Sequence, residues 1–184
     1  MKTNKLAVII LCVLFGISNS VAQTNYYNVT KAFNENGYVY QCNVHNIDVS
    51  LYNKSNLLMF SDHTYKDGKP VGDLYREGKS RTYFVQDDTW TKPKAYSIVN
   101  GAFSATEKQR LKDHVLSITM YINSDSGNVV EVEFGFLTVS GFATIPVSVY
   151  RKIETDLKSQ IWFTPTVEGK KLKYIMHHWV HEVK

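Results

Sequence analysis

Apolar and polar residues alternate most regularly over two segments in the second half of the chain. The segments 116–122 and 129–136 each place an apolar side chain at every second position, and the polar loop 123–128 separates them. A period of two is typical of strands with one buried face, so the pattern predicts an antiparallel hairpin with its apolar faces on one side of a sheet. The alternating positions are Leu116, Ile118, Met120, Ile122, Val130, Val132, Phe134 and Phe136.

Helical signals flank this hairpin. Ser104 and Glu107 have the spacing of a capping box, which predicts a short helix that begins there. An apolar residue recurs every fourth position from Val149 to Ile161, with charged residues between, which predicts an amphipathic helix that covers the hairpin. We expect Pro146 in its first turn and Pro165 after its end. The segment Leu172–Val183 is predicted as a last strand.

The first half of the mature chain contains short apolar and aromatic runs separated by residues that favour turns. These runs predict a strand-rich region over 23–100, with a soft boundary near Asn100 and Gly101. The sequence therefore predicts an α+β protein with a strand-rich region over 23–100 and an α-β-β-α-β region over 101–184; one continuous domain over 23–184 is the alternative. The expected strands of the first region are Tyr38–Val44, Leu57–Phe60, Asp73–Arg76, Arg81–Gln86 and Ala95–Val99.

The first 22 residues have the features of a signal peptide. A short basic segment with Lys2 and Lys5 precedes an apolar run over 6–17, which is too short to span a bilayer. Ser20 and Ala22 are the small residues expected before a cleavage site. We therefore expect export, cleavage after Ala22 and no stable membrane span in the mature chain.

Composition excludes several classes of protein and partner. The 184-residue chain is 43% hydrophobic and 21% charged, which is ordinary for a globular protein and unlike a disordered chain. The net charge of +4 comes from 21 basic and 17 acidic residues, and removal of Lys2 and Lys5 lowers it to +2. Such a small charge predicts no nucleic-acid partner.

Cysteine usage excludes an intrachain disulfide in the mature protein. Of the two cysteines, Cys12 is lost with the leader and Cys42 remains. We expect Cys42 to be a small buried side chain, with an intermolecular disulfide as the alternative.

The order of elements after residue 103 resembles the C-terminal domain of TonB, the periplasmic energy-coupling protein of Gram-negative bacteria. The similar features are the segment Gly127–Val132, the helix that ends at Phe163-Thr164-Pro165, the turn Glu168–Lys171 and the last strand. The resemblance covers about residues 104–183 and implies a helix on a three-stranded antiparallel sheet. This chain has a predicted cleavable leader and no proline-rich spacer, so the resemblance implies a fold and a mode of binding but no energy transduction.

Motifs for chemistry are scarce. His177, His178 and His181 suggest a metal site, but on a strand His177 and His181 would lie about 13 Å apart, too far for one ion. We therefore predict no metal and no cofactor. The pairs Asp87/Asp88 and Glu131/Glu133 are the candidate carboxylates for a hydrolase that acts on envelope glycans, with an aromatic cleft in the first region.

These observations favour a non-enzymatic binding or assembly module of the periplasm or cell surface, with the glycan hydrolase as the alternative. An unpaired edge of the last strand would accept a strand from another envelope protein. The side chains expected to flank that contact are Tyr174, His177, Trp179 and His181.

Overall fold

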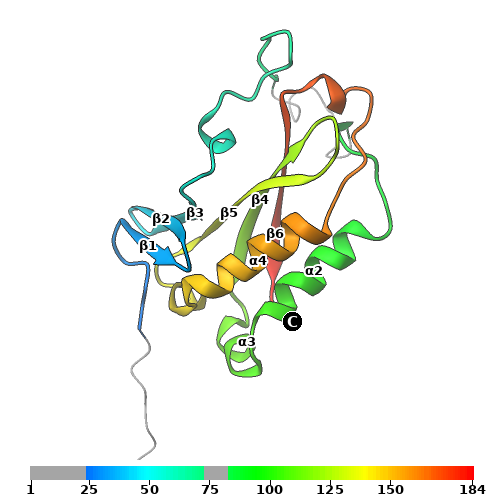
Figure 1. Ribbon diagram of the computed structural model, residues 1–184. Helices are drawn as coiled ribbons and strands as arrows, with labels where there is room; N and C mark the ends of the chain where they lie inside the picture. The colour runs from blue at the N-terminus through cyan, green and yellow to red at the C-terminus, as the bar shows by residue number, and fades with distance from the viewer. Residues whose placement is uncertain (1–23, 73–82) are drawn as a thin grey trace, which may run out of the picture.

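One antiparallel sheet organises the protein. The computed structural model describes residues 24–72 and 83–184, and its six strands have the spatial order β1-β2-β3-β5-β4-β6 (Figure 1). The strands are β1 (Lys31–Glu35), β2 (Tyr38–His45), β3 (Asp48–Asn53), β4 (Val115–Asn123), β5 (Val129–Leu137) and β6 (Tyr174–Glu182). The leader and the expected strand Asp73–Arg76 lie outside the described residues, as do the first two residues, 81–82, of the next expected strand.

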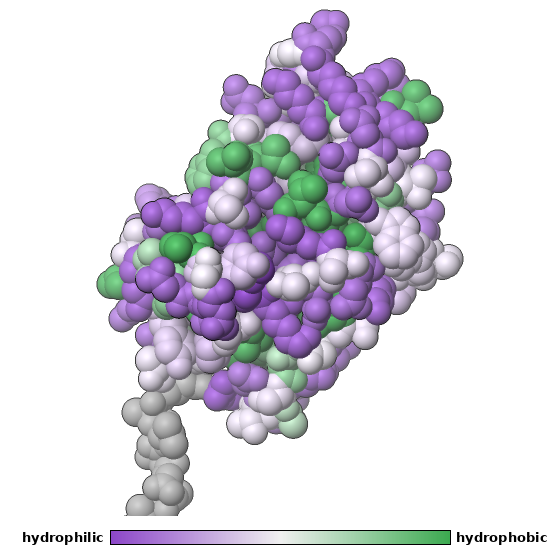
Figure 2. Space-filling model, in the orientation of Figure 1, coloured by the Kyte–Doolittle hydropathy of each residue, from purple (hydrophilic) through white to green (hydrophobic). Residues whose placement is uncertain are grey.

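Two long helices, α2 (Thr91–Ala102) and α4 (Val147–Gln160), lie side by side across one face of the sheet (Figure 1). The short helix α3 (Ala105–Leu111) follows α2. The surface on this side is mainly hydrophilic, with hydrophobic residues in small separate groups (Figure 2). The helices therefore bury their apolar faces between themselves and the sheet.

The predicted hairpin is confirmed. β4 pairs with β5, and Ile118 faces Phe134 across the pair. Leu116, Ile118 and Phe134 are completely buried, as the alternation requires. In the connecting loop Gly127 has a φ of +78°, and the carbonyl of Phe163 lies where its side chain would project. A glycine is therefore required there, both for the turn and for the close approach of the chain that follows α4.

The helices expected around the hairpin also form. Ser104 and Glu107 make a complete capping box at the start of α3. α4 buries Ile153 and Leu157 against the sheet, although Pro146 is its N-cap and stands one position before the first turn. The last strand forms as β6, so β5, β4 and β6 provide the three expected strands within a larger sheet. The specific TonB-like arrangement remains a resemblance.

Two predictions in the first region are wrong. The segment Ala95–Val99, predicted as a strand, lies inside α2, where Ala95, Ile98 and Val99 form its buried side. The segment Leu57–Phe60, also predicted as a strand, contains the 3₁₀ turn η1 (Leu58–Phe60). Of the expected strand Arg81–Gln86, the described part forms only an isolated bridge between Val85 and Pro165.

The two expected regions share one sheet. β2 forms as predicted, while β1 and β3 are additional strands that complete a meander. β3 pairs with β5, which joins the first region to the second. Asn100 and Gly101, the expected boundary, both lie within α2.

A buried carboxylate connects α4 to β2. Glu154 is completely buried and accepts a hydrogen bond from the Tyr40 hydroxyl, while Arg151 and Lys158 contact its two oxygens at 3.2 and 3.4 Å. Burial, followed by the nearby Glu154 charge, raises the pKa of Tyr40. A buried charge requires such partners, so this cluster fixes α4 on the first hairpin.

Cys42 is a free thiol with no exposed surface. Its sulfur lies 3.7 Å from the Val29 carbonyl oxygen, and burial raises the pKa of this thiol.

Within residues 24–72 and 83–184, no helix has the length and hydrophobicity needed to cross a membrane.

Candidate functional site

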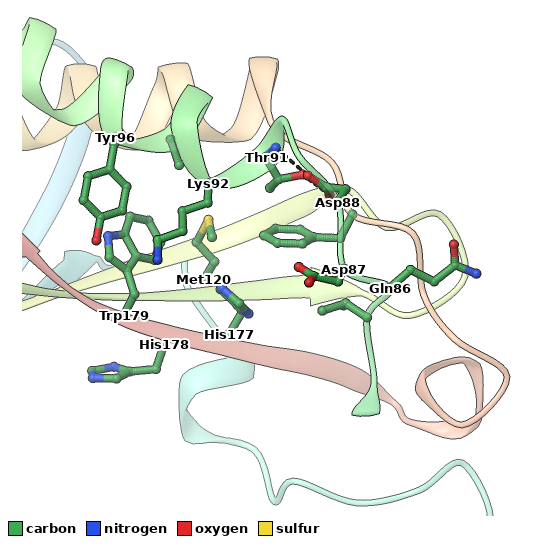
Figure 3. A pocket seen from close by; sticks show the side chains of 13 residues that line it. Gln86, Asp87, Asp88, Thr91, Lys92, Tyr96, Met120, His177, His178 and Trp179 are labelled. Carbon is green, nitrogen blue, oxygen red and sulfur yellow. Dashed lines mark hydrogen bonds between the residues drawn. The ribbon is translucent and has the colours of Figure 1, made fainter. Parts of the chain in front are cut away.

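A pocket of about 200 Å³ lies between α2, β6 and the segment 85–88 that leads into α2 (Figure 3). Segments from distant parts of the sequence thus meet at one place. The lining residues are Val85, Gln86, Asp87, Asp88, Thr91, Lys92, Ala95, Tyr96, Met120, Phe163, His177, His178 and Trp179.

The sheet provides one wall. Side chains alternate along β6, and the strand pairs Met120 with His177 and Ile118 with Trp179. His177 and Trp179 therefore lie on the same side of β6, toward the helices. The His177 ring lies 5.0 Å from the Phe163 ring and 6.4 Å from the Trp179 ring, measured between centroids. This wall is a run of neighbouring rings with Met120 beside it.

Helix α2 provides the opposite wall. Ala95 and Tyr96 follow Thr91 and Lys92 by one helical turn, so both pairs face the same side. The Lys92 ammonium lies 5.8 Å from the centroid of the Tyr96 ring. A positive charge and an aromatic surface are thus adjacent on this wall.

Asp88 fixes the start of α2. Its Oδ1 accepts hydrogen bonds from the backbone N–H groups of Trp90 and Thr91 at 2.9 and 2.6 Å, and its Oδ2 accepts one from the Thr91 hydroxyl (Figure 3). Partial burial opposes ionisation of Asp88, but the hydrogen bonds from Thr91 and Trp90 outweigh it and lower the pKa. Asp88 is therefore ionised and hydrogen-bonded to the start of α2, whereas its neighbour Asp87 is exposed at the rim.

The structure separates the four residues predicted on the last strand. His177 and Trp179 line the pocket. Tyr174 is 3% exposed on the other face of the sheet, and its hydroxyl donates to the Ser61 carbonyl at 2.8 Å. His181 is completely buried, with Nε2 3.2 Å from Asn100 Oδ1. Only two of the four side chains therefore line this pocket.

His181 lies behind this wall, beside the Tyr96 ring and the Asn100 amide. Its ring centroid is 4.6 Å from that of Tyr96. Burial, followed by the positive charge of Lys184, lowers the pKa of His181 to about 4. Within the described residues His181 Nδ1 and Trp179 Nε1 are buried without a hydrogen-bond partner. An unpaired buried group costs about 1–3 kcal/mol, so this wall is not optimised for stability alone.

The carboxylates considered for hydrolysis do not gather at one place. Asp87 and Asp88 reach the pocket. Glu131 instead accepts hydrogen bonds from the backbone of Leu57 and Leu58 and so holds the η1 turn. Glu133 accepts from the Ser50 and Tyr121 hydroxyls at 2.5 and 3.3 Å. Each of these two glutamates has a structural partner outside the pocket.

No cluster of three or more metal-ligating side chains occurs among residues 24–72 and 83–184.

The sequence profile of the domain of unknown function DUF5043 matches residues 23–179, most of the chain. The chain belongs to the DUF5043 family.

A solved structure supports the same assignment. The crystal structure of a DUF5043 family protein from Bacteroides uniformis is similar to this chain, with 36% sequence identity and a TM-score of 0.81. The match covers 88% of this chain and 89% of the Bacteroides protein. A search of curated proteins found no match.

Sequence reasoning gave no site role to several lining residues of this DUF5043 domain, among them Lys92, Met120 and Phe163. Met120 was recognised as a core residue of a strand. Its position beside His177 of β6, however, depends on the register between β4 and β6. Lys92 and Tyr96 are four positions apart and share a face only on a helix. A helical interpretation of residues 91–102 would have placed them together.

Proposed function

We propose that this DUF5043 protein is an exported, non-enzymatic binding protein whose ligand occupies the pocket between α2 and β6. The observation that carries the proposal is the composition of the pocket. Its walls present the rings of Tyr96, His177 and Trp179, and its rim presents Asp87 and Lys92. Apolar walls with a few polar groups at the mouth are typical of small-molecule sites.

Export rests on the leader alone. The DUF5043 match begins at residue 23, so it does not include the leader. The resemblance to the TonB domain favours the periplasm or cell surface of a Gram-negative bacterium. N-terminal sequencing of protein recovered from the cell envelope is expected to begin at Gln23, and a mature chain that begins at Met1 would refute this part of the proposal.

The geometry favours binding over hydrolysis. A glycosidase needs two carboxyl groups free to donate and accept protons across the scissile bond. In the pocket the Asp88 oxygens accept hydrogen bonds from Trp90 and Thr91 at the start of α2, which leaves Asp87 as the carboxylate available to a ligand. We therefore expect saturable binding of envelope glycans without turnover, and product release from polysaccharide or peptidoglycan would favour the hydrolase.

The ligand site can be tested with the indole signals of the three tryptophans, Trp90, Trp162 and Trp179. We would add single-ring probes, phenol among them, to ¹⁵N-labelled mature protein and follow the indole N–H resonances. The Trp179 resonance, assigned with Trp179→Phe, is expected to shift and saturate. Trp162 is 54% exposed and does not line the pocket, so its resonance is the internal control.

Equal shifts of both resonances, or no shift of either, would contradict the proposal. Equal shifts would indicate nonspecific contact of the probe with exposed rings. The absence of a shift would show that the pocket does not accept a ring of this size.

Assembly through β6 is the second candidate, and the occupant that we propose is a second copy of this chain. β6 is the last strand of the described sheet and pairs there with β4. Met176 and Val180, each about half exposed, lie at equal distances from His178, the middle residue of β6. Antiparallel pairing centred on His178 would therefore place Met176 of each copy opposite Val180 of the other copy. Both exposed apolar side chains would then be covered.

His63 lies beside Tyr174, with a ring separation of 5.1 Å, so the proposed pairing begins after Tyr174. His178→Cys is expected to form a disulfide-linked dimer under mild oxidation, because the central residue of a two-fold pair faces its own copy. Thr138→Cys, in the loop after β5, is the control. A monomer in light scattering together with no cross-link would refute this second candidate.

A further inference from the structure

We infer that the ligand of this pocket is a single neutral pyranose ring, stacked on Trp179 and Tyr96 and hydrogen-bonded by Asp87 and Lys92. This inference rests on the proposed function, since it names the ligand class of the same site. We base the inference on the lining of the pocket, which combines aromatic side chains on the walls with one negative and one positive side chain at the mouth.

Size limits the ligand to one ring. The pocket measures about 200 Å³, whereas sites for drug-sized ligands usually measure about 300–1,000 Å³. A dry cavity of about 150 Å³ accepts benzene. The pocket therefore accepts one six-membered ring. Further units of a chain would extend past Gln86, which is exposed and lines the pocket.

Charge makes a neutral ligand the best fit. The rim presents one carboxylate, Asp87, and one ammonium group, Lys92. Asp88 is also negatively charged, but the N–H groups at the start of α2 donate to its carboxylate and partly offset this charge. An anionic ring would gain from Lys92 what it loses to Asp87, and a cationic ring would gain from Asp87 what it loses to Lys92, so a single charge on the ligand brings no net advantage.

The arrangement of apolar and polar groups distinguishes a sugar from a hydrocarbon ring. A hydrocarbon would fill the space beside Ala95 and Met120 but would remove water from Asp87 and Lys92 without replacing its hydrogen bonds, which is costly. A pyranose has an apolar face of C–H groups and a periphery of hydroxyls that both donate and accept. Its face can stack on Trp179 while its hydroxyls donate to Asp87 and accept from Lys92.

The Lys92 charge and the aromatic rings are close enough for one small molecule to contact both. The Lys92 ammonium is 5.8 Å from the Tyr96 ring centroid, and the Trp179 and His177 centroids are 6.4 Å apart. These separations are comparable to the width of a single sugar ring, so a ring stacked on Trp179 and Tyr96 would lie beside the Lys92 ammonium, with Asp87 farther along the pocket beyond His177 (Figure 3).

The test is a titration of ¹⁵N-labelled mature protein, followed through the Trp179 indole resonance. The neutral probes are the methyl pyranosides of glucose, galactose and mannose. The comparison probes are cyclohexanol, phenol, glucuronate, glucosamine and zwitterionic phenylalanine. We expect at least one methyl pyranoside to saturate with a dissociation constant of about 1 mM, and every comparison probe to bind at least tenfold more weakly than this sugar.

Variants then test the two rim groups. Asp87→Asn and Lys92→Met are each expected to weaken binding of the pyranoside three- to tenfold. The matched control is the pair Asp67→Asn and Lys69→Met, because Asp67 and Lys69 form an exposed ion pair 3.0 Å apart that does not line the pocket. Equal binding by the rim variants and the wild type would overturn the assigned hydrogen bonds.

The remaining outcomes separate this inference from the proposed function. If cyclohexanol, phenol or phenylalanine saturates the Trp179 signal and the pyranosides do not at 50-fold higher concentration, the ligand class is wrong and the pocket remains a binding site. If glucuronate or glucosamine binds best, the argument from charge is wrong. If no probe moves the Trp179 resonance, the inference and the proposed function both fail.

Discussion

His181 should make the stability of the protein depend on pH. The side chain is completely buried, with its ring 4.6 Å from that of Tyr96, and its pKa in the folded protein is about 4. In the unfolded chain a histidine has a pKa of about 6.5. At a pH between these two pKa values, the unfolded state therefore binds a proton that the folded state does not bind. The free energy of unfolding consequently decreases as the pH falls from about 6.5 to about 4.

The size of this effect follows from the two pKa values. Between pH 7 and pH 4.5 the linkage amounts to a loss of about 2 kcal/mol in the free energy of unfolding. For a chain of this size that loss corresponds to a fall of about 4–8 °C in Tm. Other groups also titrate in this range, so the contribution of His181 must be isolated by comparison with a variant.

The assay is urea unfolding of the wild type and His181→Gln at pH 7 and pH 4.5. Glutamine can still donate to Asn100 Oδ1 but does not titrate, so the variant is expected to lose about 2 kcal/mol less than the wild type over this interval. The control His45→Gln changes an exposed histidine of β2 and should follow the wild type. Equal losses for the wild type and His181→Gln would refute the reasoning. His181→Leu provides the same comparison if the glutamine variant does not fold.

Two further substitutions test local features of the fold. Ser104→Ala removes the capping box with Glu107 and should lower the free energy of unfolding by about 1 kcal/mol, as measured in urea. Gly127→Ala should cost at least about 2 kcal/mol more than Gly68→Ala, because both glycines have positive φ but only Gly127 lies against the Phe163 carbonyl. Similar Tm values for Gly127→Ala and Gly68→Ala would contradict the close approach of the Phe163 carbonyl to Gly127. An unchanged Tm for Ser104→Ala would contradict the capping box of α3.

Local pattern was sufficient for the second half of the fold. Strict alternation over β4 and β5, the capping box of α3 and the four-residue period of α4 each use interactions within one element or one hairpin. In these elements the local preference and the tertiary environment agree, which is why a single sequence was enough to predict them.

The two errors in the first half have different causes. In α2 the short apolar run Ala95–Val99 suggested a strand, yet Ala95, Ile98 and Val99 have the spacing of a helix face, and Asp88 accepts a hydrogen bond from the first N–H of the helix. That signal was present in the sequence. The η1 turn, in contrast, is held by Glu131, more than 70 residues away in the chain, and no local pattern encodes this contact.

The candidate site shows the same division. His177 and Trp179 were predicted as functional from the aromatic and histidine content of the last strand, and Asp87 and Asp88 were considered separately as catalytic acids. The structure brings both sets to one pocket. Their proximity depends on where α2 crosses β6, which the sequence pattern of either segment does not determine.

The central claim is that the pocket between α2 and β6 binds the ligand, and a pair of tryptophan variants tests it most directly. Calorimetric titration with the probe that best saturates the Trp179 resonance should show at least tenfold weaker binding for Trp179→Ala. Trp162→Ala removes an exposed ring that packs on Trp90 outside the pocket, and it should bind within twofold of the wild type. Wild-type affinity in a folded Trp179→Ala protein would contradict the account.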